Sequence, residues 1–309
     1  MHVLTCTDSR FVIPTGVMLT SLIINNQDDI INIHLIIDAS VTDNQKEQLK
    51  SEFGRYNNTT LSFYTINVED IKEYLVVKRE CFPVSIYYRL LLETIIPSGI
   101  NKILYLDGDI VVRQNLKELW QTDLANFSVG AIINQSISYS YWERLEYPKE
   151  KGYFNSGVLL INLKYWREHK LALQFIDYIK NNPEKLLYPD QDVLNYVLQD
   201  SKIFLPVRYN MQEMFYRINR DYIPCENTEE INAAIFDPYI IHYTAGKPWF
   251  IESNHPLKKQ YYKILSKTQW KWNRSMEISR VLKFSYFKYV VKRILGIEKD
   301  NVKYKKIKL

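Results

Sequence analysis

Short apolar runs alternate with stretches of helical periodicity over about the first 200 residues of the chain. The apolar runs predict buried strands at 3–6, 33–37, 61–66, 103–106, 129–133 and 158–161. The helical patterns predict helices after Pro14, from Thr42, and over 85–96, 164–180 and 190–198. Gln45 follows Thr42 at the spacing of a capping box. Strands that alternate with helices predict an α/β fold built on a doubly wound, mainly parallel sheet.

Two carboxylates, Asp107 and Asp109, follow the apolar run 103–106 with Gly108 between them. Side chains two residues apart in an extended chain point to the same side, and glycine lets a ligand approach the backbone. Hard oxygen donors prefer Mg²⁺, Mn²⁺ or Ca²⁺, and ligands bind beyond the carboxyl ends of strands in such sheets. The pattern indicates a cation site; the alternative for so short a motif is a solvated turn with one acid capping the next element.

The nine glycines do not cluster, and neither G-x-G-x-x-G nor G-x-x-x-x-G-K-[ST] occurs. A bound phosphate would therefore be neutralised by a metal ion and cationic side chains. The cysteines, Cys6, Cys81 and Cys225, are odd in number and lack a C-x-x-C spacing, which disfavours a disulfide framework or a zinc site. With no signal peptide and no apolar run of about 20 residues, a cytoplasmic protein is expected.

The net charge of +5 is unevenly distributed. Residues 266–309 hold 13 Lys and Arg against 3 Asp and Glu, which leaves 27 of the 40 basic and 32 of the 35 acidic residues in 1–265. This contrast predicts a boundary near residue 265, between a mildly acidic domain over 1–265 and a basic, aromatic, helical tail over 266–309. Basic residues interleaved with aromatic ones suit the surface of an anionic membrane, so peripheral attachment to the inner face of the cytoplasmic membrane is expected. Nucleic-acid binding is disfavoured because the body is acidic, and a disordered tail is the other alternative.

Five segments occur together in one order: YRL at 88–90, YLDGDIVV at 105–112, YFNSGVLLINLKYWR at 153–167, PDQDVLN at 189–195 and IHYTAGKPW at 241–249. Their order and spacing resemble glycosyltransferase family 8, over roughly residues 1–250. The resemblance implies a GT-A-like fold, with a Rossmann-like nucleotide-binding half and an acceptor half. It also implies a retaining transferase that moves glucose or galactose from a UDP-sugar to a glycan or lipid-linked saccharide, as in lipopolysaccharide or surface polysaccharide assembly.

The resemblance assigns roles around the metal and the nucleotide. Asp107, Asp109 and His242 would bind Mn²⁺, with Mg²⁺ as the alternative, and Asp107 would also contact the donor. Lys247 would place its charge on the diphosphate, a role that suits an ammonium group. The residues alone leave two alternatives open: His242 as a structural histidine, and Lys247 as a solvated loop lysine.

A second set of roles concerns the base and the sugar. The resemblance implies that Asp8 accepts from the uracil N3–H; otherwise it caps the first turn of the following helix. Phe11 would stack on the base. Arg89 would contact the donor sugar, or else pair with the aspartates. Asn155 and Asp190 match positions near the donor sugar.

Gln191 corresponds to the residue beneath the anomeric carbon. No Glu suited to a double displacement is evident, and an amide is a poor nucleophile, so a front-face reaction with electrostatic stabilisation of the departing UDP is favoured. Asn134 stands where lipopolysaccharide-type members often have aspartate, so the acceptor stays open. Two alternatives remain, a phosphatase of the haloacid dehalogenase type and a catalytically silent sugar-nucleotide-binding protein.

Overall fold

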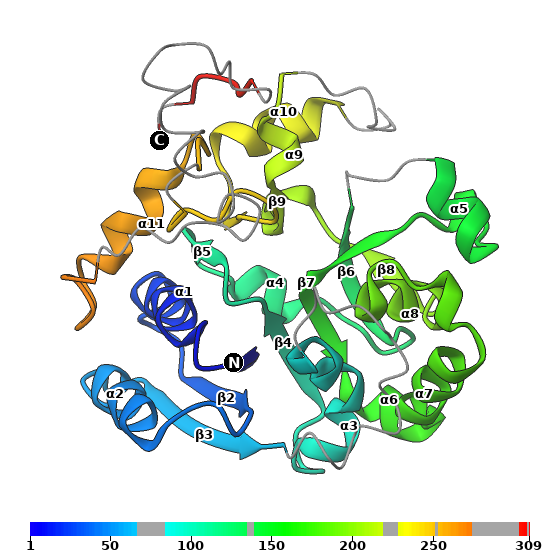
Figure 1. Ribbon diagram of the computed structural model, residues 1–309, viewed down its shortest axis with the longest axis horizontal. Helices are drawn as coiled ribbons and strands as arrows, with labels where there is room; N and C mark the ends of the chain where they lie inside the picture. The colour runs from blue at the N-terminus through cyan, green and yellow to red at the C-terminus, as the bar shows by residue number, and fades with distance from the viewer. Residues whose placement is uncertain (67–83, 135–138, 219–227, 251–252, 274–302, 308) are drawn as a thin grey trace, which may run out of the picture.

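The computed structural model of the chain describes residues 1–66, 84–134, 139–218, 228–250, 253–273, 303–307 and 309 (Figure 1). Its main sheet has seven strands in the order β3-β2-β1-β4-β7-β6-β8. The strands are β1 (His2–Thr7), β2 (Ile31–Ile37), β3 (Thr59–Thr65), β4 (Lys102–Leu106), β6 (Val129–Ile133), β7 (Phe154–Asn162) and β8 (Lys202–Phe204). All six predicted strands are confirmed, with ends shifted by up to four residues. The GT-A-like α/β fold is confirmed as well.

Most strand pairs are parallel, but β7 runs antiparallel to both of its neighbours, β4 and β6. A second, three-stranded sheet has the order β5-β10-β9. It is formed by β5 (Ile110–Val112), β9 (Met211–Gln212) and β10 (Ile240–His242). This small sheet matters for function because β5 follows Asp109 directly and β10 ends at His242.

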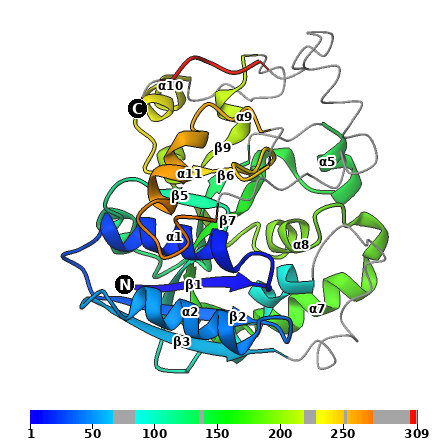
Figure 2. The same cartoon turned by 60° about the vertical axis from the view of Figure 1, so that its left-hand side comes forward.

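Helices cover both faces of the main sheet (Figures 1 and 2). The α-helices of the described residues are α1 (Val12–Ile24), α2 (Asp43–Phe53), α3 (Leu92–Ile95), α4 (Lys117–Gln121), α5 (Tyr139–Leu145), α6 (Leu163–His169), α7 (Leu171–Asn181), α8 (Pro189–Val197), α9 (Glu213–Tyr216), α10 (Thr228–Phe236) and α11 (Lys258–Leu265). Short 3₁₀ segments are η2 (Val84–Leu91), η3 (Lys149–Lys151), η4 (Pro183–Lys185) and η5 (Val207–Tyr209). The predicted capping box at Thr42 and Gln45 is present at the start of α2.

Two predicted helices differ from the structure. The expected helix over 85–96 is a 3₁₀ run, η2, that continues into the single turn of α3. The expected helix over 164–180 is broken into α6 and α7 at Lys170, which adopts a left-handed conformation with φ 51°. A left-handed residue ends the α6 hydrogen-bonding pattern and redirects the chain, and lysine gives no sequence signal for it.

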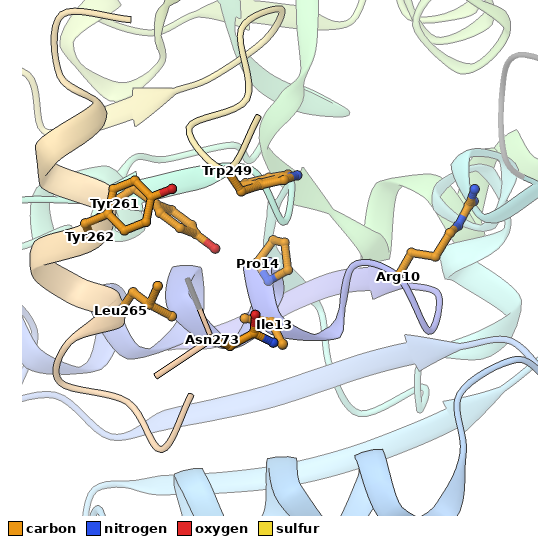
Figure 3. Close-up of a pocket in the computed structure, with 8 residues that line it drawn as sticks. All are labelled: Arg10, Ile13, Pro14, Trp249, Tyr261, Tyr262, Leu265 and Asn273. Carbon is orange, nitrogen blue, oxygen red and sulfur yellow. The ribbon is translucent and has the colours of Figure 1, made fainter. Parts of the chain in front are cut away.

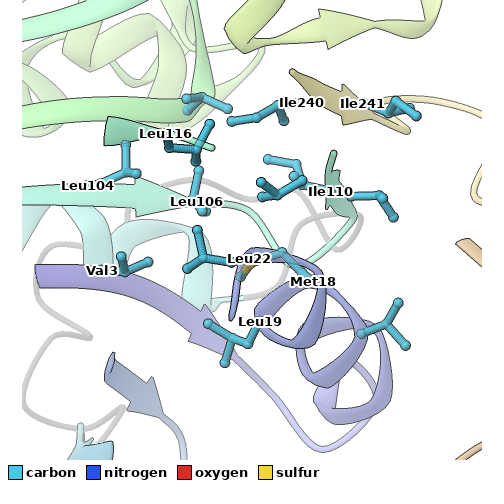
Figure 4. Close-up of a cluster of buried hydrophobic side chains, with 14 of the residues drawn as sticks. Val3, Met18, Leu19, Leu22, Leu104, Leu106, Ile110, Leu116, Ile240 and Ile241 are labelled. Atoms are coloured by element: carbon cyan, nitrogen blue, oxygen red, sulfur yellow. The ribbon is translucent and has the colours of Figure 1, made fainter. Parts of the chain in front are cut away.

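Alternation along the strands divides the core between the two faces of the sheet. Val3, Leu104 and Leu106 join a cluster under α1 and α2, whereas Leu4 and Ile103 join a cluster under α6, α7 and α8. Figure 4 shows the first cluster between α1, β4 and the second sheet, which contributes Ile240 and Ile241. The strand ends that carry the acidic residues are therefore fixed by packing on both sides.

Residues 268–270, just after α11, pack on the main body of the chain. Trp270 is 7% exposed and lies over Gly16 of α1, where an added Cβ would sit 2.3 Å from the indole ring. The backbone N–H of Gln269 donates to the carboxylate of Glu52 at 2.8 Å. Most of the predicted membrane-binding tail, residues 274–302, lies outside the described residues, as do Cys81 and Cys225. In the described part of the chain, no helix has the length and apolar character needed to span a membrane.

Candidate active site

Asp107, Asp109 and His242 meet at the carboxyl end of β4. One potential ligand atom from each lies within 4.8 Å of the other two, and the structure thus brings the predicted metal triad together. His242 Nε2 lies 3.2 Å from Asp109 Oδ1 and 3.8 Å from Asp107 Oδ2. The pairing of β10 with β5 aligns His242 opposite Ile110, one residue beyond Asp109, which explains how residues so distant in sequence meet.

A hydrogen bond to Asn210 determines which ring nitrogen of the neutral His242 imidazole carries the proton. Nδ1 of the imidazole lies 2.9 Å from Asn210 Oδ1, and an amide oxygen only accepts, so Nδ1 carries the proton. Nε2 is then left with its lone pair toward the aspartates, as a metal-binding imidazole requires. Two carboxylates and one imidazole nitrogen suit Mn²⁺ or Mg²⁺.

Asn210 belongs to a chain of amides that reaches Gln191. Asn210 Nδ2 donates to Asn155 Oδ1 at 2.9 Å, and Asn155 Nδ2 donates to Gln191 Oε1 at 3.1 Å. The side chain of the predicted sugar-binding residue Asn155 therefore connects the metal triad to Gln191. Sequence reasoning missed Asn210, because a lone asparagine between η5 and β9 carries no recognisable motif.

Lys247 forms an ion pair with Asp109 and also donates to the carbonyl of Tyr243 at 2.9 Å. Burial alone would raise the pKa of Asp109, but the ammonium of Lys247 holds that pKa well below its ordinary value. Asp109 is therefore a carboxylate at any physiological pH. The ammonium of Lys247 lies directly at the predicted metal site, where it adds positive charge for a polyanionic ligand.

Two glycines leave the space in which the side chains around the metal triad pack closely. A Cβ on Gly157 of β7 would lie 2.2 Å from His242 Cε1 and 2.6 Å from Asp107 Oδ2. A Cβ on Gly108 would lie 2.6 Å from Thr15 Oγ1. Real Cβ atoms do not approach other atoms so closely, so a larger residue at position 157 would displace the triad, and one at position 108 would displace Thr15.

Arg89 is 6% exposed and lies among the acidic residues. Its guanidinium is 2.9 Å from Asp107 Oδ1 and 3.3 Å from Asp190 Oδ2, and it donates to the Ser156 carbonyl at 2.9 Å. Burial raises the pKa of Asp190, an effect that Arg89 opposes. Arg89 thus pairs with both aspartates, and its predicted contact with a donor sugar stays a prediction.

Gln191 lies at the start of α8 and is 7% exposed. Its carbonyl oxygen accepts from Asn155 Nδ2 and from the backbone N–H of Ser156, both at 3.1 Å. Two donors on one amide oxygen withdraw electron density from it, which disfavours covalent attack on a sugar. Asn134, at the end of β6, is also buried, and its N–H donates to the Tyr153 carbonyl at 2.8 Å.

The predicted uridine residues lie just before α1. Asp8 Oδ1 accepts from the N–H groups of Arg10 at 2.9 Å and Phe11 at 3.2 Å, which both precede α1; the N-cap position of α1 has no side-chain hydrogen bond, so Asp8 does not cap the first turn of this helix. Phe11 contacts Trp249 edge to face, with ring centroids 5.7 Å apart. A pocket beside them opens between the first turn of α1, Trp249 and α11 (Figure 3). The uracil contact of Asp8 and the stacking of Phe11 stay predictions.

Comparison with known proteins gives a consistent result. The profile of the family described as Glycosyl transferase family 8 matches residues 2–252. A lipopolysaccharide 1,2-glucosyltransferase from Escherichia coli is 30% identical over 270 residues, which cover 85% of this chain and 77% of that protein. General stress protein A from Bacillus subtilis is 26% identical, with 87% of this chain and 94% of that protein covered.

Solved structures share the fold. The galactosyltransferase LgtC, crystallised with donor and acceptor sugar analogues, aligns with a TM-score of 0.77 and 23% identity, covering 92% of this chain and 99% of that one. The glycosyltransferase GlyE from Streptococcus pneumoniae aligns with a TM-score of 0.62 and 21% identity, covering 94% of this chain and 64% of that one.

Proposed function

The chain belongs to glycosyl transferase family 8 and is a hexosyltransferase, and we propose that it transfers glucose or galactose from a UDP-sugar to a saccharide acceptor with retention of anomeric configuration. The observation that carries this proposal is the meeting of Asp107, Asp109 and His242 beside Lys247. Two carboxylates, an imidazole lone pair and an ammonium group suit a cation-bound nucleotide diphosphate.

In this proposal Asp107, Asp109 and His242 hold Mn²⁺ or Mg²⁺. When bound, the cation neutralises charge that develops on the diphosphate as the bond to the sugar breaks. Lys247 adds a second positive charge on the same group, which is electrostatic catalysis. The buried ion pairs of Arg89 keep the carboxylates of Asp107 and Asp190 in place.

The donor would lie between the uridine residues and Gln191. Asp8 and Phe11 contact the base, Asn155 and Asp190 contact the sugar, and Gln191 lies beneath the anomeric carbon. Because the Gln191 oxygen already accepts two hydrogen bonds, it stabilises an oxocarbenium-like centre electrostatically and forms no lasting bond. This favours a front-face reaction, in which acceptor and leaving group share one side of the sugar.

The acceptor proposal rests on relatives. Several are named as lipopolysaccharide glucosyl- or galactosyltransferases, which favours a lipid-linked or polysaccharide acceptor. The phosphatase and silent-binder alternatives find no support, because the family profile and the fold are those of glycosyltransferases and the metal triad is complete.

A donor screen tests the proposal. With Mn²⁺ present, we expect slow release of UDP from UDP-glucose or UDP-galactose, and none from ADP-glucose, because Asp8 would accept from uracil N3–H, a donor that adenine lacks. EDTA should abolish the release and added Mn²⁺ should restore it. Failure of every UDP-hexose in the screen, together with no uptake of UDP in calorimetry, would refute the assignment.

We also propose, from composition, that residues 266–309 bring the catalytic domain 1–265 to an anionic membrane. Among the described residues of this segment, Trp272 is 83% exposed, and Lys271 Nζ lies 5.6 Å from its ring centroid. Trp270, in contrast, is part of the core, so a truncation at residue 265 would disturb the fold as well as remove charge.

Charge reversal in the full chain tests membrane attachment without truncation. The triple variant Lys288→Glu, Lys292→Glu, Arg293→Glu should lose most binding to vesicles containing phosphatidylserine, since each basic residue contributes roughly 1 kcal/mol near such a surface. Co-sedimentation measures the bound fraction, with phosphatidylcholine vesicles as the control. Equal binding of variant and wild type would contradict the proposal.

A further inference from the structure

Glu213 is a buried carboxylate close to, but outside, the predicted metal triad. It is the first residue of α9 and is 2% exposed. A buried carboxylate is stable only when charged or strong hydrogen-bond donors satisfy it. Besides Arg217 on the same stretch of chain, its partners come from two segments distant in sequence: the loop that carries Lys247 and the C-terminal segment 303–305.

The first set of partners lies in the loop between His242 and Lys247. Glu213 Oε2 accepts from the backbone N–H of Gly246 at 2.5 Å. The backbone N–H of Glu213 donates to Thr244 Oγ1 at 3.4 Å. Glu213 thus contacts the loop at two positions between His242 and Lys247. Gly246 directly precedes Lys247, so the bond at Gly246 restricts the backbone from which the ammonium reaches Asp109.

The second partner is the C-terminal segment 303–305. Tyr304 OH donates to Glu213 Oε1 at 2.6 Å, beside Arg217 Nη2 at 2.7 Å. The N–H of Ile218 donates to the Lys303 carbonyl at 2.8 Å, and that of Lys305 to the Tyr216 carbonyl at 2.9 Å. The segment, red in Figures 1 and 2, therefore lies along the chain that follows α9.

These contacts keep Glu213 ionised. Burial alone would raise its pKa, but the donors Tyr304, Arg217 and Gly246 hold the pKa below its ordinary value. The carboxylate oxygens are thereby shared between the loop on one side and the C-terminal segment on the other.

We propose that Glu213 is a positioning residue for Lys247, and that Tyr304 couples the C-terminal segment to the nucleotide site through it. The inference rests on the proposed role of Lys247 on the diphosphate. Loss of the Tyr304 hydroxyl leaves Glu213 less restrained, so the loop samples positions in which the ammonium no longer reaches its ligand.

The test measures UDP affinity of the full chain by calorimetry in Mn²⁺ buffer. We expect Tyr304→Phe to weaken UDP binding about fivefold, the usual scale for one lost hydrogen bond, and Glu213→Gln to weaken it more. Tyr64→Phe is the matched control, because its hydroxyl bonds His34 at the far edge of the main sheet, and it should bind UDP as the wild type does.

A double-mutant cycle separates positioning from a general structural effect. In a Lys247→Ala background, Tyr304→Phe should cause no further loss of UDP affinity, because the group that it positions is gone. Equal losses in both backgrounds, or no loss in the wild-type background, would overturn the inference. Absence of UDP binding by the wild type would instead refute the proposed function. Should Glu213→Gln fail to fold, Tyr304→Phe alone decides the matter.

Discussion

Asp109→Asn is expected to reduce Mn²⁺-dependent UDP release roughly a thousandfold or more, about 4 kcal/mol of lost transition-state stabilisation. Asparagine fits the same space but removes the charge that His242 and Lys247 both face. Without that charge the site loses one of two anionic ligands, and cation affinity falls with it. The measurement is initial UDP release from the preferred donor across a Mn²⁺ titration.

Asp177→Asn is the matched control for Asp109→Asn. Asp177 is exposed on α7, where it accepts from Asn181, and it should retain full activity. Thermal unfolding should show both variants folded. Activity of Asp109→Asn within tenfold of the wild type would contradict the assignment of Asp109 as a metal ligand.

Gly157→Ala is expected to lower UDP release about a hundredfold, because the added methyl group occupies space that the triad uses. The atoms that it meets belong to the side chains of His242 and Asp107, at 2.2 and 2.6 Å, so these side chains must move away from the added carbon. Changes in the residues that surround and orient metal ligands typically reduce metal affinity or activity 10- to 100-fold. Mn²⁺ affinity, measured by calorimetry, should fall in parallel with activity.

Gly99→Ala provides the comparison, since a Cβ at Gly99 meets no atom within 4 Å. This variant should match the wild type in activity and Mn²⁺ affinity. If Gly157→Ala lost activity while its Mn²⁺ affinity stayed unchanged, the collision with the triad would not be the cause.

The main sheet was largely predictable because most of its strands, such as β1, β2, β4 and β7, are largely buried apolar runs. The antiparallel direction of β7 was not, since a fully buried strand has the same composition in either direction. The strands β8, β9 and β10, of three, two and three residues, are too short for a periodic signal. Because β10 was not predicted as a strand, no local pattern placed His242 beside the aspartates, and only the family resemblance joined them.

Asp107, Asp109 and His242 lie together as predicted, but the contacts that surround them were not predictable. The ion pairs of Arg89 with Asp107 and Asp190 depend on η2, which the helical pattern did not distinguish from a regular helix. The roles of Asn210 and Glu213 depend on side chains that meet across β9, α9 and the loop after β10. Such contacts are set by tertiary packing, which local patterns do not record.

The bonds from His242 through Asn210 and Asn155 to Gln191 all run in one direction, each member giving a hydrogen to the next. The series contains three carboxamides and no carboxylic acid, so the direction of its hydrogen bonds does not change with pH. Aspartate at position 210 would break this polarity, since it offers no hydrogen to Asn155 and would favour a doubly protonated imidazole. The orientation of the Gln191 carboxamide thus depends on the tautomer of a histidine at the other end of the series.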